Sequence, residues 1–328
     1  MKDVEYIKFI VFMLLIYSMV NEKGDFLDFK ELQYIASIAR NHSITKAAQE
    51  LFISQPSLSK YLQNLEMNLG IKLFNRLGNR FVLTYAGERY VAYAKRILLV
   101  KKELDDELSD ISNLNKGRLN IAFPLIRGSY MIPATLPRFR EMYPNVEVNL
   151  FEESSSVLEK LLLSGEADIA IFNHPINDPE LDYEILRKEE IVLAVSKDHP
   201  LANHGSVVKN CKFPWIDIKS FENDDFILYF SEQRTGQIAL QIFEAAKISP
   251  RIILRTRSIE GALRLASSGY GLCFVAATHL KFIYLKPTPN YFSIGNPKTE
   301  VELVVAFRKG AYLPLYTQDY IKIVKSCL

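Results

Sequence analysis

The fold of the N-terminal part of the chain is decided by residues 43–60, which read SITKAAQELFISQPSLSK. Ser43 and Ser54 can each cap a helix, because a serine hydroxyl accepts a hydrogen bond from a free N–H of the first turn. Ala47 and Ala48 are small enough to let two helices approach closely. Two such helices joined by a very short turn predict a helix-turn-helix.

Apolar residues at helical spacing lie on both sides of this stretch. A first helix, which ends near Asn41-His42, is predicted by Phe29, Leu32, Ile35, Ala36 and Ala39. The third helix carries a stripe that Gly70 closes, formed by Leu58, Leu62, Leu65 and Leu69. Three helices within some forty residues complete the predicted domain.

The face opposite the leucine stripe has side chains suited to reading DNA. No acidic residue occurs between Gln55 and Leu65. Gln and Asn can hydrogen-bond adenine edges, and Lys can contact guanine or phosphate. The alternative is a polar surface helix without a partner. We predict that DNA is contacted by Gln55, Pro56, Ser57, Ser59, Lys60, Gln63 and Asn64, together with Thr45 and Lys46 of the preceding helix.

A hairpin is predicted directly after the third helix. Residues 71–84 contain two apolar, strand-like pieces on either side of Gly78-Asn79, a dipeptide typical of hairpin turns. Arg76 and Arg80 flank this turn, where a wing would lie against DNA phosphates.

The distribution of charge agrees with this prediction. Residues 30–96 contain ten Lys or Arg and four Glu, whereas the formal net charge of the whole chain is only +2. A basic block on a slightly acidic remainder fits one nucleic-acid-binding domain attached to a part with another task.

Residues 84–114 read as one long amphipathic helix. Apolar residues near the heptad period include Tyr90, Ala94, Ile97, Leu104 and Leu108. We predict that these five residues form a dimer contact with a second copy of the chain, while packing against the chain's own domains is the alternative. A hinge is expected at residues 113–117.

From Arg118 onwards, strands and helices alternate. Strands predicted at 119–123, 146–152 and 168–172, with helices at 133–142 and 157–164, indicate a βαβαβ unit. A second unit follows, with strands at 191–196, 226–229, 251–254 and 271–275 and helices at 233–246 and 259–268. Two lobes with crossings near Glu190 and Phe282 would leave a ligand cleft between the strand ends.

The predicted fold class is therefore α/β with a winged helical N-terminal domain. The expected segments are an extension at 1–26, a winged helix-turn-helix at 27–84, a linker helix at 85–116 and an effector domain at 117–328. Within the effector domain, lobe I comprises 117–190 and 283–328, and lobe II comprises 191–282.

The extension contains an apolar stretch, Ile7–Val20, which is shorter than the ~20 residues of a membrane span. Three readings stay open: a misassigned start with Met19 as the true start, an additional helix, or a membrane anchor. The three cysteines are far apart and fit neither a disulfide framework nor a zinc site, which favours a reducing cytoplasm.

From about Leu27 to Val324 the chain resembles the LysR-type transcriptional regulators. In the first domain the resemblance rests on residues 29–32 (FKEL), 43–51, 54–59, 71–76 (IKLFNR) and 83–87 (LTYAG). Further along it rests on residues 136–140 (LPRFR), 143–144 (YP), 167–171 (ADIAI), 197–202 (KDHPLA) and 267–271 (SSGYG).

The resemblance implies a winged helix-turn-helix, a dimerising linker helix and a two-lobed effector domain of the type 2 periplasmic-binding-protein kind. Family members are commonly tetramers that bend promoter DNA in response to an effector. Residues matching Gln55, Pro56, Ser57 and Lys60 approach base edges in the family, and those matching Arg76 and Arg80 lie near the DNA backbone.

The effector contacts are less closely defined. Where the family usually has Ser or Thr at the end of the first effector-domain strand, this chain has Pro124. Backbone N–H groups, hydroxyls and guanidinium groups nearby suggest a carboxylate-bearing small molecule; the alternative is that the two arginines only pair with local acids. The candidates are Arg127, Gly128, Ser129, Asn173, His174, Ser231, Gln233, Arg234 and Thr235.

Two other classes of protein are disfavoured by the sequence. Phosphate-loop, nucleophile-elbow, zinc-protease and dinucleotide-binding motifs are absent, so we predict no enzyme, no metal and no cofactor apart from the effector. A membrane-tethered solute receptor would leave residues 30–84 unexplained. The expected partners are double-stranded promoter DNA, the effector, further copies of the chain as a dimer or tetramer, and RNA polymerase, with no membrane.

Overall fold

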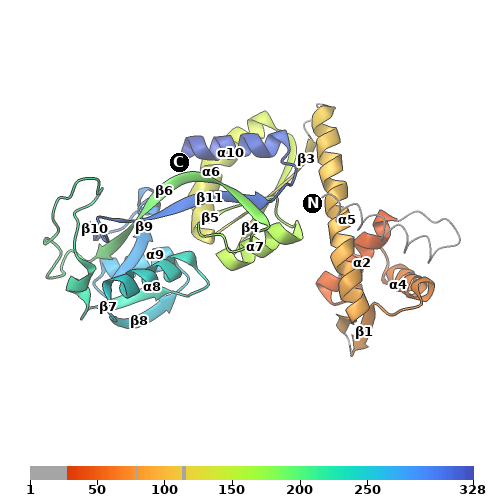
Figure 1. The fold of residues 1–328 in the computed structure, drawn as a ribbon, viewed down its shortest axis with the longest axis horizontal. Helices are drawn as coiled ribbons and strands as arrows, with labels where there is room; N and C mark the ends of the chain where they lie inside the picture. Colours follow the sequence, from red (N-terminus) through yellow and green to blue (C-terminus); the bar gives the residue numbers. More distant parts are fainter. Residues whose placement is uncertain (1–27, 79, 113–115) are drawn as a thin grey trace. The chain divides into compact units, whose positions relative to one another are not determined.

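The protein is described here from a computed structural model, which describes residues 28–78, 80–112 and 116–328. The chain divides into two units at Asp105 and Asp106, and each unit is described by itself (Figure 1). The predicted extension at 1–26 and its apolar stretch lie outside the described residues, as does Asn79 of the predicted hairpin turn.

The first unit contains the three predicted helices. They are α2 (Phe29–Asn41), α3 (Ile44–Glu50) and α4 (Gln55–Leu69). Ser43 and Ser54 cap α3 and α4 by accepting hydrogen bonds from the N–H groups of Lys46 and Ser57. Asp28 caps α2 in the same way. The helix starts are therefore set by local hydrogen bonding, as the sequence predicts.

The three helices share one apolar core. Ile35 of α2, Ala47 of α3 and Leu58 of α4 are completely buried in it. The methyl groups of Ala47 and Ala48 keep the helix spacing short, so that the turn between α3 and α4 needs only a few residues. The helix-turn-helix is confirmed.

A two-stranded hairpin follows α4. Strands β1 (Phe74–Leu77) and β2 (Arg80–Leu83) pair in antiparallel fashion on either side of the predicted turn. Leu73 and Phe74 are buried against the helices, whereas Leu77 and Arg80 at the tip of the hairpin are exposed. The hairpin is thus anchored at its base and projects its tip into solvent.

The long helix α5 (Tyr85–Ile111) begins one residue later than predicted, because Thr84 acts as its cap and accepts a hydrogen bond from the N–H of Gly87. Gly87 is required there, since a Cβ atom would lie 1.9 Å from the carbonyl oxygen of Leu73. The predicted helix end at Leu114 lies outside the described residues.

The predicted dimer stripe of α5 divides into two parts. Val91 and Ala94 are buried, and Tyr90 packs on the core of the helix-turn-helix and donates a hydrogen bond to Glu31. Ala94 is 1% exposed within one copy of the chain, so its assignment to a dimer contact is corrected, whereas Tyr90 and Ile97 are half-buried and stay predicted contacts. Exposed apolar residues occur further along, at Val100, Leu104, Leu108 and Ile111.

Lobe I of the second unit is built on three parallel strands in the order β4, β3, β5. These are β3 (Lys116–Phe123), β4 (Asn145–Glu152) and β5 (Ile169–Asn173). Ile121 faces a core covered by α6 (Leu125–Met142) and α10 (Leu315–Cys327), and its neighbour Ala122 faces a core covered by α7 (Ser155–Ser164). This alternation gives the helix-on-both-sides architecture of an α/β lobe.

Helix α6 differs from its prediction, which had it begin at Pro133. The helix begins at Leu125 and contains both Pro133 and Pro137. Proline lacks a backbone N–H and normally ends a helix, so the sequence favoured a start at the proline itself. The earlier start places Arg127, Gly128 and Ser129 in the first helical turns rather than in a loop.

Two long strands connect the lobes. Strands β6 (Leu181–Val195) and β11 (Thr299–Arg308) pair in antiparallel fashion over almost the whole length of β11, and Figure 1 shows them running side by side through both lobes. The predicted first crossing near Glu190 lies within β6. The second crossing was expected near Phe282 and is corrected to β11, because β10 (Asn290–Ser293) still pairs with the lobe II half of β6.

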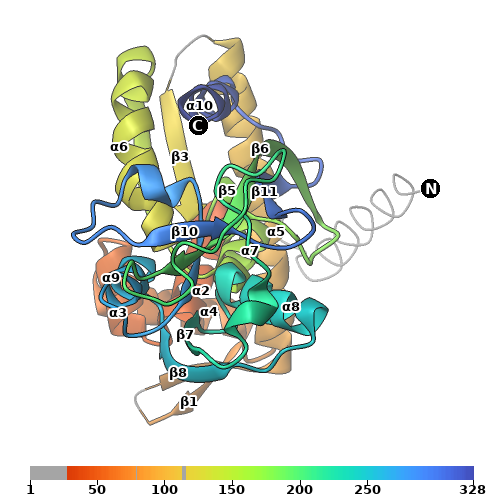
Figure 2. The ribbon, with the colours of Figure 1, turned by 90° about the vertical axis from the view of Figure 1, so that its left-hand side faces the viewer.

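Lobe II surrounds the far half of β6. Its further elements are β7 (Asp225–Tyr229), α8 (Arg234–Ala246), β8 (Arg251–Thr256), α9 (Ile259–Ser267), β9 (Cys273–Ala276) and the short helices η1 (Ile218–Phe221) and η2 (His279–Lys281). Leu193 packs towards α8 and its neighbour Val192 towards α9. Figure 2 shows these two helices on opposite sides of the lobe.

Candidate DNA-binding face and effector cavity

The polar face of α4 is open to solvent. Leu58, Leu62 and Leu65 occupy the buried face, and among the predicted DNA contacts only Ser59 is half-buried. The exposed candidates on this helix are Gln55, Pro56, Ser57, Lys60, Gln63 and Asn64, and Thr45 and Lys46 of α3 are exposed as well. These side chains are accessible to a DNA groove without any change in the fold.

Two details define the chemistry of this face. The hydroxyl oxygens of Ser54 and Ser57 lie 2.6 Å apart, so the helix cap also orients the Ser57 side chain. Lys60 has no ion-pair partner among the described residues, and its charge is therefore free for a phosphate or a guanine.

A buried carboxylate joins α4 to the hairpin. Glu66 is 6% exposed, and its Oε1 accepts hydrogen bonds from the N–H groups of Leu73 (2.8 Å) and Phe74 (3.1 Å). Its Oε2 accepts a bond of 2.6 Å from Lys72. Sequence reasoning missed this residue, although an acid one position after Leu65 at the edge of the apolar stripe was a signal for it. Glu66 fixes the hairpin relative to the DNA-reading helix.

Arg76 and Arg80 are both exposed on the hairpin. The Nε of Arg76 donates to the carbonyl oxygen of Gly78 at 3.2 Å, which leaves the rest of its guanidinium in solvent. The hairpin thus exposes two cations, and the exposed face of α4 in the same unit has no acid.

The second unit contains a cavity of about 820 Å³ between its lobes. Four helices begin at this cavity: α6 and α7 from lobe I, and α8 and α9 from lobe II. Seven of the nine predicted effector residues line it, namely Arg127, Gly128, Ser129, Asn173, Gln233, Arg234 and Thr235. The predicted position of the cleft at the strand ends therefore agrees with the geometry.

Arg127 is not free to bind an anion. Its guanidinium donates to both carboxylate oxygens of Glu189, at 3.1 and 2.7 Å, and both side chains are at most 1% exposed. Asn173 and Thr278 also donate to this carboxylate, at 2.8 and 2.6 Å. Burial alone would raise the pKa of Glu189, but the charge of Arg127 and these hydrogen bonds lower it to about 2. The expectation of a free cation at Arg127 is corrected.

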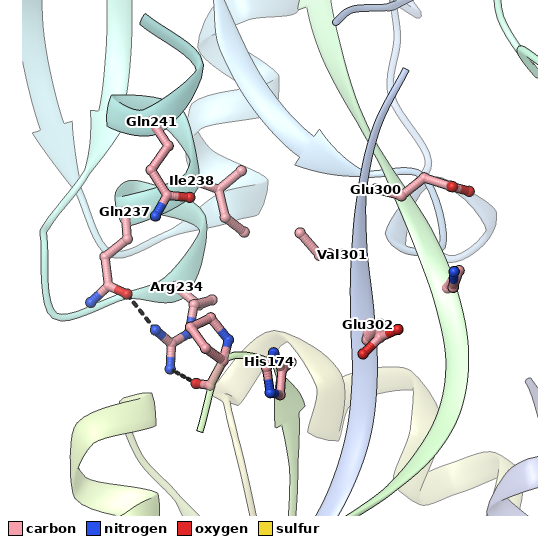
Figure 3. Close-up of a pocket in the computed structure, with 10 residues that line it drawn as sticks. His174, Arg234, Gln237, Ile238, Gln241, Glu300, Val301 and Glu302 are labelled. Carbon is pink, nitrogen blue, oxygen red and sulfur yellow. Dashed lines mark hydrogen bonds between the residues drawn. The ribbon is translucent and has the colours of Figure 1, made fainter. Parts of the chain in front are cut away.

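Arg234 is also engaged, as a link between the lobes. From the first turn of α8 it donates to the backbone carbonyls of Asn173 (3.2 Å) and Pro175 at the end of β5, and to the Gln237 side chain at 2.6 Å. Figure 3 shows the guanidinium directed towards the loop that contains His174. The guanidinium is therefore bonded to lobe I carbonyls, and its Nη2 atom lies 3.7 Å from the Oε1 of Glu159.

Arg234 lines both the large cavity and a smaller one of about 340 Å³, whose lining residues are drawn in Figure 3. The predicted effector residue His174 lines the smaller cavity, together with Gln237, Gln241 and Glu302. Ser231 lines neither of these two cavities, and its carbonyl oxygen accepts a hydrogen bond from Gln237. The geometry thus separates these two candidates from the other seven.

Several residues of the large cavity were not predicted. Glu152 is the last residue of β4 and Glu153 follows it, Glu260 lies in the first turn of α9, and Arg257 at the cavity edge pairs with Glu232 at 2.6 Å. His279 also lines the cavity although it is 3% exposed, and neither of its ring nitrogens has a hydrogen-bond partner among the described residues. These residues come from segments without any recognisable motif.

The thiols and the possible metal ligands give no further site. Burial raises the pKa of Cys273 to about 12, which keeps this thiol protonated. Within the described ranges, no group of three or more His, Cys, Asp or Glu side chains is arranged to hold a metal ion. No helix in the same part of the chain has both the length and the apolar character needed to cross a bilayer.

Comparison with known families agrees with the two-unit description. The family described as bacterial regulatory helix-turn-helix protein, lysR family, matches residues 29–88, and the family described as LysR substrate binding domain matches residues 112–327. A winged helix-turn-helix followed by a two-lobed effector domain defines a DNA-binding transcription regulator. The chain belongs to the LysR family of these regulators.

Individual relatives cover nearly the full length. The chain is 32% identical to the uncharacterised HTH-type transcriptional regulator YcgK of Bacillus subtilis, over 92% of this chain and 95% of that protein. It is 27% identical to the transcriptional regulator AlsR of the same organism, over 88% and 93% of the two chains.

Solved structures show the same fold. A full-length OxyR variant from Pseudomonas aeruginosa matches with a TM-score of 0.71 at 20% identity, over 93% of this chain and 95% of that one. Full-length CbnR, crystallised with its target DNA, matches with a TM-score of 0.59 at 22% identity, over 92% and 100% of the two chains.

Proposed function

We propose that this regulator binds promoter DNA through α4 and the β1–β2 hairpin, as an oligomer, under the control of a small molecule held in the 820 Å³ cavity. The observation that carries the proposal is the acid-free, exposed face of α4, which the buried Glu66 holds in register with the basic hairpin tip. A helix and a wing fixed in this way fit a major groove and its flanking phosphates.

The DNA contacts divide by chemistry. Gln63 and Asn64 offer amide groups for adenine edges, and Lys60 offers an ammonium group for guanine or phosphate. Arg76 and Arg80 would anchor the hairpin on the DNA backbone without reading sequence. The relative CbnR has been crystallised with its target DNA, which supports double-stranded DNA as the partner.

Self-association follows from the far half of α5. Leu104, Leu108 and Ile111 are 51–70% exposed and recur at spacings of four and three residues, which places them on one helix face. Because exposed leucines in this register are typical of helix pairs, we propose that a second copy of α5 covers them. Two DNA-binding units per dimer would then read two half-sites. A tetramer of two such dimers and contact with RNA polymerase complete the proposal.

The effector cavity regulates by its position between the lobes. A ligand that contacts both α6 and α8 can favour one arrangement of the lobes over another. It does so only if its affinity differs between the two arrangements. The chain acts through such binding rather than through catalysis, and in the cytoplasm, where its DNA is found.

The test is selection of bound sequences from a random double-stranded DNA library by the full-length protein. We expect enrichment of one motif with two half-sites, whereas a library that remains random would refute sequence-specific binding. Lys60→Ala should weaken binding to the enriched site by ~1–3 kcal/mol if Lys60 reads a base. Asn68→Ala, at an exposed position near the other end of α4, is the matched control and should leave affinity unchanged.

A further inference from the structure

The fixed charges of the large cavity indicate the chemical class of its ligand, an inference that rests on the proposed effector function. Three guanidinium groups line the cavity, and all three already have partners. Arg127 is paired with Glu189, Arg257 with Glu232, and Arg234 bonds backbone carbonyls of lobe I beside Glu159. None of the three supplies an uncompensated positive charge to a ligand.

Uncompensated negative charge is present instead. Glu152 and Glu153 line the cavity and are exposed to it, and neither carboxylate has an ion-pair or hydrogen-bond partner within the described ranges. Glu152 is closely placed: its Oε1 lies 3.1 Å from the position that a Cβ atom on Gly128 would occupy. This carboxylate therefore lies against the first turns of α6.

The cavity also has partial positive charge, which comes from backbone N–H groups at helix N-termini. The first residues of the four helices that begin at the cavity are Leu125, Ser155, Arg234 and Ile259. The N–H groups of the first two residues of each helix have no hydrogen-bond partner among the described residues, whereas the third N–H is bonded to the residue before the helix. With the helix dipole, the free N–H groups favour a negative group. Helix N-termini from both lobes and the Glu152 carboxylate thus offer charges of opposite sign within one cavity.

Three residues that line the cavity have buried polar atoms without a hydrogen bond among the described residues. These atoms are both ring nitrogens of His279, the Oε1 of Gln233 and the Nε of Arg127. Burial, and then the nearby charge of Arg127, lower the pKa of His279 to about 3, so the ring is neutral and can donate from one nitrogen and accept at the other. Leaving such groups unpaired is unfavourable, and a polar ligand would satisfy them.

We propose that the effector is an α-amino acid, with its carboxylate on the helix N-termini and its ammonium group on Glu152 and Glu153. The carboxylate expected from the sequence is kept, but its partners are backbone N–H groups instead of the two predicted arginines. The ammonium group supplies the donor that Glu152, Glu153 and Gln233 lack. A ligand with only a negative charge would be repelled by the two unpaired carboxylates. A ligand with only a positive charge would be repelled by the helix N-termini.

The test measures binding of the twenty protein amino acids, one at a time, to the full-length protein by thermal shift and then by calorimetry. At least one should bind. The same molecule without its amino group, and the same molecule without its carboxylate, should each bind at least ~10-fold more weakly, because each loses a charge-assisted contact. Absence of binding by all twenty, or equal binding of either truncated molecule, would overturn the proposal.

Variants separate the ammonium site from general damage. Glu152→Gln combined with Glu153→Gln should weaken binding of the same amino acid at least ~10-fold, since neutral amides no longer compensate the ammonium charge. Glu141→Gln, which removes an exposed carboxylate of α6 outside the cavity, should bind like the unaltered protein. Unchanged binding by the double variant would contradict the assignment.

DNA binding distinguishes this inference from the function on which it rests. The double variant should select the same DNA motif as the unaltered protein, because both substitutions lie in the second unit. If no amino acid binds but the motif is still selected, only the ligand class is wrong. If no motif is selected, the proposed regulator function itself fails.

Discussion

Arg127 in α6 and Glu189 in β6 form a two-point ion pair in which both side chains are almost fully buried. The pair connects the first turns of α6, which begins at the cavity, with β6, which runs through both lobes. Its neighbour Asn173 donates to Glu189 and accepts from Arg127, while its carbonyl oxygen accepts from Arg234. The candidate effector arginines are thus parts of the frame that supports the cavity.

The ion pair predicts a specific dependence of stability on pH. Because the pKa of Glu189 is lowered from 4.5 to about 2 in the folded protein, its contribution is complete above pH ~4.5 and is lost as the pH falls towards 2. We expect Glu189→Gln to lower the free energy of unfolding by ~3–5 kcal/mol at neutral pH, since it leaves Arg127 buried without a counter-charge. The difference from the unaltered protein should shrink between pH 4.5 and 2.

The measurement is urea unfolding followed by fluorescence of Trp215, the single tryptophan of the chain, which belongs to lobe II. The double change Arg127→Met with Glu189→Leu removes both charges and should recover much of the lost stability. A stability difference that stays constant from pH 7 to pH 2 would show that Glu189 does not titrate as described.

A second prediction concerns the anchor of the hairpin. Glu66→Ala removes the acceptor for the N–H groups of Leu73 and Phe74, which stay buried, and each unsatisfied group costs ~1–3 kcal/mol. We expect lower thermal stability of the first unit and weaker DNA binding. Glu66→Gln keeps a carbonyl oxygen at this position and should retain more of both. Equal behaviour of the two variants would indicate that the hydrogen bonds to Leu73 and Phe74 do not hold the hairpin.

The elements that sequence predicted well are those fixed by local chemistry. Ser43 and Ser54 mark helix starts because a cap depends on neighbouring residues only. The spacing of the leucines in α4 likewise predicts which face of the helix is buried. The start of α6 was missed because the helix continues through Pro133 in its interior, whereas the local rule places a proline at the start or the end of a helix.

The site was predicted less completely for the same reason. Sequence patterns identified most of the segments around the cavity. They did not indicate which side chains form ion pairs or hydrogen bonds with residues distant in sequence. Glu189 is 62 residues from Arg127, and nothing in either local sequence indicates their pairing. His279 follows a strand without any motif, and only the fold brings it to the cavity.

A third prediction tests self-association through α5. Leu104→Glu with Leu108→Glu places charges on the exposed apolar face, so that two copies of the helix would repel each other. Because both residues are exposed, the chain itself should fold normally. We expect light scattering to show monomers at concentrations where the unaltered protein is oligomeric. Ala92→Glu, at an exposed position nearer the start of α5, is the control, and an oligomeric double variant would exclude this face as the contact.

A fourth prediction separates the hairpin arginines from the residues that read sequence. Arg76 and Arg80 are exposed at the hairpin and offer charge without a fixed geometry, which suits phosphates. Each phosphate contact releases counterions, so the logarithm of affinity falls linearly with the logarithm of salt concentration. Arg80→Ala should reduce this slope by about 1 and weaken all DNA sequences alike, whereas Lys60→Ala should change the preferred sequence if Lys60 contacts a base. Titration of both variants against the selected site and a scrambled site, at several salt concentrations, measures the two effects independently. If Arg80→Ala left the slope unchanged, the hairpin tip would not lie on the DNA backbone, and the acid-free face of α4 would have to account for binding alone.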